Sequence, residues 1–350
     1  MTVLFLYTEL AEYFLKCCEA LSGEASVHIV RWPVNKEAPF EFSVSPSIKI
    51  YDKTNYSRSQ LHELAERIRP DLICCSGWID KDYLSVAKAY YGKIPTVLSF
   101  DTHWRGDLKQ TFASLISPFT LLKRFSHAWV PGETQFRYAR KLGFAAENIQ
   151  RGFYCCDLPY FNALYNEQKD IKSKALPKVF LYVGRYYDFK GVTDLWEAFV
   201  SLQSETNSEW ELWCLGTGSI PPLSHPKIKH FGFVQPKQLA PILQSSGVFV
   251  LPSRFEPWAV VVQEYASAGF PLLLSKAVGA AEAFLEEGVN GYSFEPNQWA
   301  DLKNQLKKII NSDPNELLLM AENSHRLAQK INHQNWVASV KAIKNGYKQN

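Results

Sequence analysis

The feature that most constrains the fold of this chain is a regular alternation of short apolar segments with amphipathic ones. Residues 2–7 and 71–76 are apolar runs of strand length, whereas 59–68 and 81–91 have the spacing of apolar positions that helices show. The alternation starts again at residue 178, after a polar stretch without clear periodicity. Strands that alternate with helices in this way are typical of a doubly wound parallel sheet. The sequence therefore predicts an α/β fold with two domains of this kind.

Domain boundaries follow from the same pattern, because a chain of 350 residues is long enough for two hydrophobic cores. We expect an N-terminal domain over 1–165, a linker over 166–177 and a second domain over 178–333. The last segment, 334–350, predicts a helix with one apolar face formed by Trp336, Val337, Val340, Ile343 and Tyr347.

Composition excludes several classes of protein. The chain is 46% hydrophobic and 21% charged, as in ordinary globular proteins, and its net charge of +3 is too small for general nucleic-acid binding. The seven cysteines form three adjacent pairs and a singleton, a spacing that predicts neither a metal site nor a disulfide framework. With no basic leader and no apolar run long enough to span a bilayer, we expect reduced thiols in a cytoplasmic protein.

The most informative stretch, residues 247–271, reads GVFVLPSRFEPWAVVVQEYASAGFP. It predicts a buried strand over 248–251, a polar turn, and a largely apolar helix over 258–268 that Gly269 closes. Glu264 stands out in this helix, since a buried carboxylate needs a hydrogen-bonding partner. Glu256 precedes it by eight residues, or roughly 12 Å at the helical rise of about 1.5 Å per residue.

A separation of this size approximates the span from the ribose to the hexose of a nucleotide sugar. The backbone amides around Ala259, Val260 and Val261 would then lie where the diphosphate does, and a helix N-terminus favours anions. On its own, a pair of glutamates at this spacing is more commonly a solvated face with a salt bridge.

The segment FEPWAVVVQEYASAGFP resembles the signature of the family 4 glycosyltransferases, retaining enzymes of the GT-B fold. The resemblance implies two Rossmann-like domains that face a central cleft, with Glu256 at the donor sugar and Glu264 at the ribose. The family usually has glycine where this chain has Ala259. The resemblance also implies that the terminal helix, 334–350, packs back on the N-terminal domain.

A second segment, FLYVGRYYDFKGVTDLWEAF, looks like the part of the family in which an arginine and a lysine bind the donor diphosphate. Here these residues are Arg185 and Lys190, with Gly184 directly before the arginine. A guanidinium and an ammonium beside a helix N-terminus would neutralise a leaving diphosphate. By the same resemblance, Gly216 belongs to a glycine loop of the donor site, and Phe233 and Val234 flank the base.

The N-terminal half resembles the family in its pattern of elements. The segment FDTHWRGD follows the strand predicted over 96–100, where open parallel sheets bind ligands, and is similar to the family segment with a histidine near the donor sugar. We therefore expect His103 to be catalytic with Arg185, Lys190 and Glu256. Arg105 is a weaker candidate for an anionic acceptor. Thr8 and Glu9 are acceptor candidates in the first loop, where the family often has glycines.

Residues 101–141 contain seven basic and three acidic side chains, with large apolar residues interleaved among them. This composition is consistent with a face that binds a membrane surface, which would suit a lipid-linked acceptor. It is equally consistent with a pair of core helices that carry solvated lysines, the more common arrangement.

Taken together, these patterns predict a glycosyltransferase of the hexosyltransferase type. It would transfer a sugar from a nucleoside diphosphate sugar, with UDP the expected nucleotide, to a saccharide or lipid-linked glycan in bacterial polysaccharide assembly. The resemblance implies retention of configuration and neither metal nor cofactor. The composition of residues 101–141 is consistent with peripheral contact at the inner membrane surface, and the small net charge predicts no nucleic-acid partner. Asp80 and Asp82 form an Asp-x-Asp, which we interpret as a helix start rather than a manganese site. The alternatives are a non-catalytic partner protein with this fold and a nucleotide-sugar epimerase.

Overall fold

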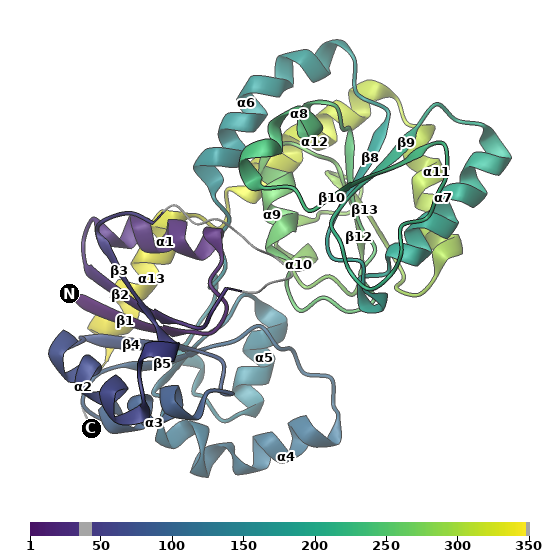
Figure 1. Cartoon of the computed structure of the whole chain (residues 1–350). Helices are drawn as coiled ribbons and strands as arrows, with labels where there is room; N and C mark the ends of the chain where they lie inside the picture. The colour runs from purple at the N-terminus through teal and green to yellow at the C-terminus, as the bar shows by residue number, and fades with distance from the viewer. Residues whose placement is uncertain (35–43, 348–350) are drawn as a thin grey trace. The chain divides into compact units, whose positions relative to one another are not determined.

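The computed structural model describes residues 1–34 and 44–347, which form two compact units (Figure 1). Unit 1 contains residues 1–156 and 331–350, and unit 2 contains residues 157–330. Each unit is a parallel sheet with helices on both faces. The predicted α/β class with two Rossmann-like halves is therefore confirmed.

Seven strands of the described residues form the sheet of unit 1, in the order β3-β2-β1-β4-β5-β6-β7, and all neighbours are parallel. The strands are β1 (Thr2–Tyr7), β2 (Ser26–Arg31), β3 (Ile48–Asp52), β4 (Leu72–Ser76), β5 (Thr96–Ser99), β6 (His127–Trp129) and β7 (Ile149–Gln150). The helices are α1 (Glu12–Ser22), α2 (Arg58–Ile68), α3 (Lys81–Tyr90), α4 (Leu108–Ile116), α5 (Glu133–Lys141) and α13 (His333–Gly346). Short 3-10 turns are η1 (Lys53–Asn55), η2 (Ser117–Phe119), η3 (Leu121–Lys123) and η4 (Ala146–Asn148).

Strand β1 shows how the alternation of side chains builds both faces of this unit. Leu4 and Leu6 point into a core shared with α2, α3 and α5. Phe5 and Tyr7 point to the other face, where both rings contact Phe14 of α1. Trp336 of α13 packs on the same face and donates a hydrogen bond from Nε1 to the carbonyl of Phe153 at 2.7 Å.

Unit 2 has a six-stranded parallel sheet in the order β10-β9-β8-β11-β12-β13. The strands are β8 (Val179–Val183), β9 (Glu211–Leu215), β10 (Ile228–Gly232), β11 (Val248–Leu251), β12 (Leu272–Ser275) and β13 (Gly291–Phe294). The helices are α6 (Leu158–Lys174), α7 (Val192–Thr206), α8 (Ala240–Gln244), α9 (Val260–Ser267), α10 (Ala281–Phe284), α11 (Trp299–Ile310) and α12 (Pro314–Ala328). Two 3-10 turns, η5 (Asp188–Lys190) and η6 (Pro236–Gln238), complete the unit. Helices α6, α9 and α12 pack together on one face, and α7 packs with α11 on the other (Figure 1).

The unit boundaries differ from the sequence expectation, because unit 2 spans 157–330, whereas the expected N-terminal domain ends at residue 165 and the expected second domain spans 178–333. Residues 166–177 were expected to be a linker, but most of them belong to α6, which begins at Leu158 with Asp157 as its N-cap. Apolar contacts explain the helix, because Leu158, Phe161 and Leu164 are buried in unit 2. The chain passes between the units at residues 156–157 and 330–331. Residues 348–350 of the expected terminal helix lie outside the described residues.

Candidate functional site

The order of strands in each sheet singles out one place for a ligand. In unit 2 the chain builds outward from β8 in one direction through β9 and β10, and in the other direction through β11, β12 and β13. The loops after β8 and β11 therefore diverge at a switch point, where open α/β sheets bind ligands at the carboxyl ends of their strands. In unit 1 the corresponding position lies between β1 and β4.

Two of the predicted catalytic residues meet at the switch point of unit 2. Lys190 ends η5 in the loop after β8, and its Nζ donates to Oε2 of Glu256 in the loop after β11. Both side chains are largely buried, with exposed fractions of 17% and 11%. The same carboxylate oxygen accepts a hydrogen bond from Oγ of the buried Ser253 at 3.3 Å. A lysine and a glutamate 66 residues apart thus form one buried pair.

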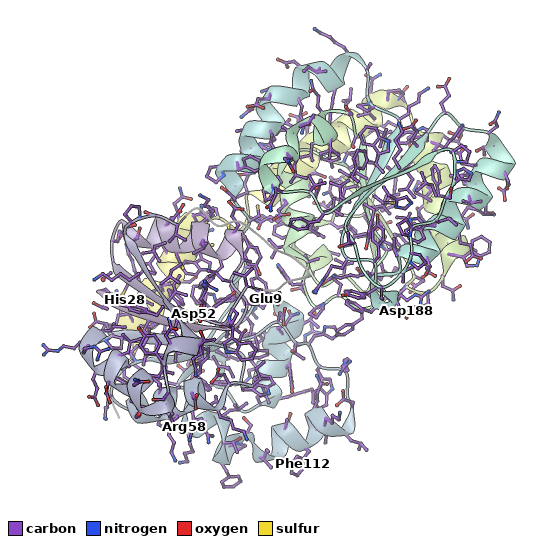
Figure 2. All side chains as sticks on the ribbon, viewed as in Figure 1. Glu9, His28, Asp52, Arg58, Phe112 and Asp188 are labelled. Atoms are coloured by element: carbon purple, nitrogen blue, oxygen red, sulfur yellow. The ribbon has the colours of Figure 1, made fainter. Side chains whose placement is uncertain are left out.

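A second ion pair, which sequence reasoning missed, holds the same two loops together. The guanidinium of Arg254 donates two hydrogen bonds to Asp194 in the first turn of α7, at 2.9 and 2.6 Å. A third bond reaches Asp188 of η5 at 2.6 Å (Figure 2 labels Asp188). These bonds, led by those to Asp194, hold the pKa of Arg254 above its ordinary value. Bidentate pairs fix orientation, so Arg254 sets the position of the segment that carries Glu256.

The start of α9 differs from the sequence expectation. The helix spans Val260–Ser267, and Ala259 is its N-cap residue, with φ 78° and ψ 85°. Glu256 therefore precedes the helix, in a bridge with Val278, and the helical rise does not give its distance from Glu264. The cause is the left-handed backbone at Ala259, which turns the chain before the helix starts. Ala259 has no side chain that could cap the helix, so the backbone amides of Val260 and Val261 at its N-terminus donate no hydrogen bond to the N-cap side chain.

The remaining donor-site candidates surround the same edge of the sheet. A Cβ atom on Gly216 would lie 2.0 Å from the carbonyl oxygen of Gly184, so the loops after β8 and β9 touch only because Gly216 has no side chain. Arg185 directly follows Gly184 in the chain, and its guanidinium carbon lies 5.7 Å from the ring centroid of Tyr187. Phe233 and Val234 are half-buried just after β10. Glu264 lies within α9 and is partly buried.

Unit 1 has a cavity of about 280 Å³ at its own switch point. It is lined at the ends of β1, β4 and β5 by Thr8, Ser76 and Ser99, and by the neighbouring loops. The hydroxyls of Thr8 and Ser76 lie 3.1 Å apart. On another wall, the Tyr154 hydroxyl donates to Asp101 at 3.3 Å, and burial with the Asp101 charge raises the pKa of Tyr154. Hydroxyls and a carboxylate make this cavity suitable for a polyhydroxyl ligand.

The other candidates of unit 1 do not line this cavity. In the described part of the chain, Glu9, His103 and Arg105 are outside its lining, although the loops that carry them adjoin it (Figure 2 labels Glu9). Gln110 of α4 holds the loop after β5: its Nε2 donates to the carbonyl of His103 at 2.8 Å, and its Oε1 accepts from the amide of Arg105 at 2.6 Å. Burial, aided by the Arg105 charge, lowers the pKa of His103, so its ring is neutral at pH 7.

Two further features concern metal binding. Asp80 is the N-cap of α3, and Asp82 pairs with Lys53 and Arg58 at 2.9 and 2.8 Å, which confirms the interpretation as a helix start. Sequence spacing did not predict the second feature, a group formed by Cys17, Cys155 and His333, whose potential ligand atoms lie within 4.8 Å of one another. The Cys17 thiol donates to the Cys155 carbonyl at 3.7 Å, and burial raises its pKa. We interpret this group as a packing contact that anchors the start of α13.

Comparisons with known proteins agree with this architecture. Residues 166–332 match the family described as Glycosyl transferases group 1. The sulfoquinovosyl transferase of Arabidopsis thaliana is 26% identical over 302 residues, which cover 80% of this chain and 55% of that protein. The lipopolysaccharide 1,6-galactosyltransferase of Salmonella typhimurium is 24% identical over 262 residues, which cover 70% of this chain and 67% of that protein. The chain thus spans about half the length of the plant relative.

Solved structures share the fold over the whole chain. Anabaena HepE in complex with UDP superposes with a TM-score of 0.72 at 15% identity and covers 99% of this chain and 100% of that one. The sucrose-phosphate synthase of Thermosynechococcus elongatus gives a TM-score of 0.71 at 17% identity, with 99% of both chains covered.

The structural matches show that the chain has the GT-B fold. Its residues 166–332 belong to the glycosyl transferases group 1 family. Among the described residues, no helix is both long and apolar enough to cross a bilayer.

Proposed function

We propose that this protein transfers a sugar from a UDP-sugar to an acceptor hydroxyl, as a hexosyltransferase. The observation that carries the proposal is the buried Lys190–Glu256 pair beside the start of α9, at the switch point of unit 2. An ammonium, a carboxylate and N-terminal helix amides at one sheet edge match the parts of a nucleotide sugar. HepE in complex with UDP supports UDP as the nucleotide.

The chemistry assigns each group a role in the transfer. As the glycosidic bond to the diphosphate breaks, negative charge develops on the leaving diphosphate and positive charge on the sugar ring. Lys190, Arg185 and the amides of Val260 and Val261 stabilise the leaving group. Glu256 holds hydroxyls of the donor sugar, Glu264 holds the ribose, and Phe233 and Val234 flank the base. His103 acts at the donor sugar as a neutral imidazole.

We further propose that the reaction proceeds with retention, as in family 4, and without a metal. Two cations and helix amides supply the charge that a divalent ion would otherwise supply. The acceptor is a saccharide or a lipid-linked glycan, in line with a relative named for lipopolysaccharide. Its candidate contacts are the cavity of unit 1, which Thr8 lines, and the neighbouring Glu9 and Arg105. The seven free cysteines suit a reducing cytoplasm, with the protein peripheral at the membrane.

The first test is a calorimetric titration of the full chain with UDP, GDP and ADP. We expect micromolar binding of UDP and much weaker binding of the other two. Release of UDP from a panel of UDP-sugars in the presence of saccharide acceptors then measures transfer. Full activity in EDTA supports a metal-free reaction, and complete loss contradicts it.

The alternatives give different results in the same assays. Turnover of UDP-sugar to a second nucleotide sugar without any acceptor would indicate an epimerase. Absence of binding to all three nucleotides would contradict the proposal and favour a non-catalytic partner protein.

A further inference from the structure

Helix α4 and the turn that follows it have an unusual distribution of side chains. The large apolar residues face solvent, with exposed fractions of 88% for Leu108, 63% for Phe112, 69% for Leu115, 37% for Ile116 and 80% for Phe119. The buried residue of α4 is a polar one, Gln110. A helix that packs only on its own unit would show the opposite pattern.

The exposed apolar residues are not scattered. Leu108, Phe112, Leu115 and Ile116 follow one another in α4 at intervals of four, three and one residues, which is the spacing of one helix face. Phe119 lies in η2, directly after the helix. Figure 2 labels Phe112 on α4 at the edge of unit 1. Isolated exposed apolar residues need no explanation, but four of them on one helix face, with a fifth in the turn that follows, indicate a binding surface.

Charge identifies the class of partner. Residues 108–124 contain three basic side chains, Lys109, Lys123 and Arg124, and no acidic one. Lys109 and Lys123 are exposed, whereas Arg124 is half-buried and donates to the carbonyl of Thr120 at 2.5 Å. We name the five apolar residues together with Lys109 and Lys123 the α4 surface. An apolar stripe flanked by lysines matches the boundary between acyl chains and anionic headgroups.

We propose that the α4 surface docks the protein on an anionic lipid bilayer. The apolar stripe enters the headgroup and acyl boundary, and the two lysines contact lipid phosphates. A second copy of the chain fits less well, because a two-fold interface would bring the stripe against itself. Lysines of each copy would then meet lysines of the other, and this repulsion has no counterpart on anionic lipid.

Contacts within unit 1 connect this surface to the candidate acceptor side. Gln110 lies on the buried side of α4, and its amide group holds both the carbonyl of His103 and the amide of Arg105. Docking of α4 therefore fixes the His103 loop next to the lipid surface. The inference that the acceptor hydroxyl is carried by a lipid rests on the proposed function; the docking itself does not.

The test is flotation of the full chain with vesicles of phosphatidylcholine, alone or mixed with phosphatidylglycerol, at low and at high salt. We expect flotation with the mixed vesicles at low salt and reduced flotation at high salt. The double variant Phe112→Ser and Phe119→Ser should lower the bound fraction at least tenfold. Because both side chains are exposed, its thermal unfolding should match that of the wild type.

Matched controls distinguish binding through the α4 surface from nonspecific adsorption of exposed apolar residues to vesicles. Ile171 and Leu319 are exposed apolar residues of unit 2, at 48% and 59%, and the double variant Ile171→Ser and Leu319→Ser should float like the wild type. The charge variant Lys109→Glu and Lys123→Glu should lose the preference for phosphatidylglycerol.

Three results would overturn the proposal: no flotation with anionic vesicles at low salt, wild-type flotation of the Phe112 and Phe119 variant, or a dimer that this variant abolishes without lipid. UDP titration is run on the same samples. Flotation without UDP binding contradicts the proposed function and leaves the docking proposal intact. UDP binding without flotation contradicts the docking proposal and leaves the proposed function intact.

Discussion

Lys190 and Glu256 form a buried ion pair that joins the loops after β8 and β11 within unit 2. Each of the two charges neutralises the other, and Ser253 adds a hydrogen bond to the carboxylate. A diphosphate that binds Lys190 competes with Glu256 for the same ammonium. Donor binding therefore frees a carboxylate beside the sugar, which makes this pair the centre of the proposed site.

The first prediction concerns this pair. Lys190→Ala and Glu256→Ala should each lower kcat/KM for transfer by at least about 100-fold, since each removes a group that faces developing charge. Each also leaves a buried charge unpaired, so both should destabilise the protein. The double variant should lose less free energy of unfolding than the two single variants lose in sum, and the difference, which is the coupling energy of the pair, should be about 0.5–3 kcal/mol. Lys276→Ala, a lysine of unit 2 with 54% exposure, is the control. Transfer at the wild-type rate by Lys190→Ala would remove Lys190 from the mechanism.

The second prediction concerns Ala259 and its φ of 78°. A left-handed backbone costs a residue with a Cβ atom about 1–2 kcal/mol, and a β-branched residue more. Ala259→Val should therefore lower the free energy of unfolding by about 1–3 kcal/mol. Ala259→Gly should leave it within about 1 kcal/mol of the wild type, because relief of strain offsets the greater entropy of the unfolded chain. Urea denaturation measures both, and a fully stable valine variant would show that the backbone at this position is not left-handed.

A third prediction tests how Glu256 is held. Gly279 donates its amide to the carbonyl of Glu256 at 2.9 Å, and a Cβ atom on it would lie 2.0 Å from the carbonyl oxygen of Pro257. Gly279→Ala must displace the segment that carries Glu256 and should weaken UDP binding at least tenfold by calorimetry. Gly23→Ala is the matched control, because its Cβ atom would approach nothing closer than 3.6 Å. Equal UDP affinity in both variants would contradict this role for Gly279.

The fourth prediction is a dependence of stability on pH that arises at Lys172. Its Nζ is buried without a hydrogen-bond partner among the described residues, 3.8 Å from the ring centroid of Phe270, and burial lowers its pKa to about 7. From about pH 7 to the unfolded pKa of about 10.5, the unfolded state binds a proton that the native state lacks, so stability rises with pH in this window.

Lys172→Met removes the burial of an amine and should stabilise the protein at pH 7 and below by a few kcal/mol. The difference should shrink as the pH rises toward about 10. Urea denaturation of wild type and variant at several pH values measures this. A difference that stays constant with pH would show that Lys172 keeps its charge in the native state.

Local patterns were sufficient to predict the sheets. The expected strands over 2–7 and 248–251 have the same bounds in the structure, because continuous apolar runs are buried on both sides of a parallel sheet. Patterns are less informative where tertiary contacts determine the local structure. Helix α6 has no clear apolar periodicity in the sequence, and burial of Leu158, Phe161 and Leu164 explains it. The turn at Ala259 is invisible to periodicity, so Glu256 was wrongly expected to lie in line with the helix.

The site shows the same division. Sequence motifs selected Lys190 and Glu256, and the structure brings them into contact. The bonds of Arg254 to Asp194 and Asp188 could not be predicted, because they join segments 60 and 66 residues apart without a recognisable spacing. The stretch 101–141 is open to two interpretations, and the sequence does not give the exposure of its individual side chains, which the structure does. Composition counts residues, but it does not tell which side of a helix is covered.

The return of α13 to unit 1 has a consequence for how the chain folds during synthesis. Trp336 closes the aromatic face formed by Phe5, Phe14 and Trp129, and it belongs to a segment that the ribosome releases after all of unit 2. Residues 1–156 therefore emerge with an apolar sheet face that α1 covers only in part, while residues 157–330 emerge as one uninterrupted folding unit. The nascent unit 1 must remain protected from aggregation until α13 is released, and a fragment that ends at Cys156 lacks the cover that Trp336 supplies.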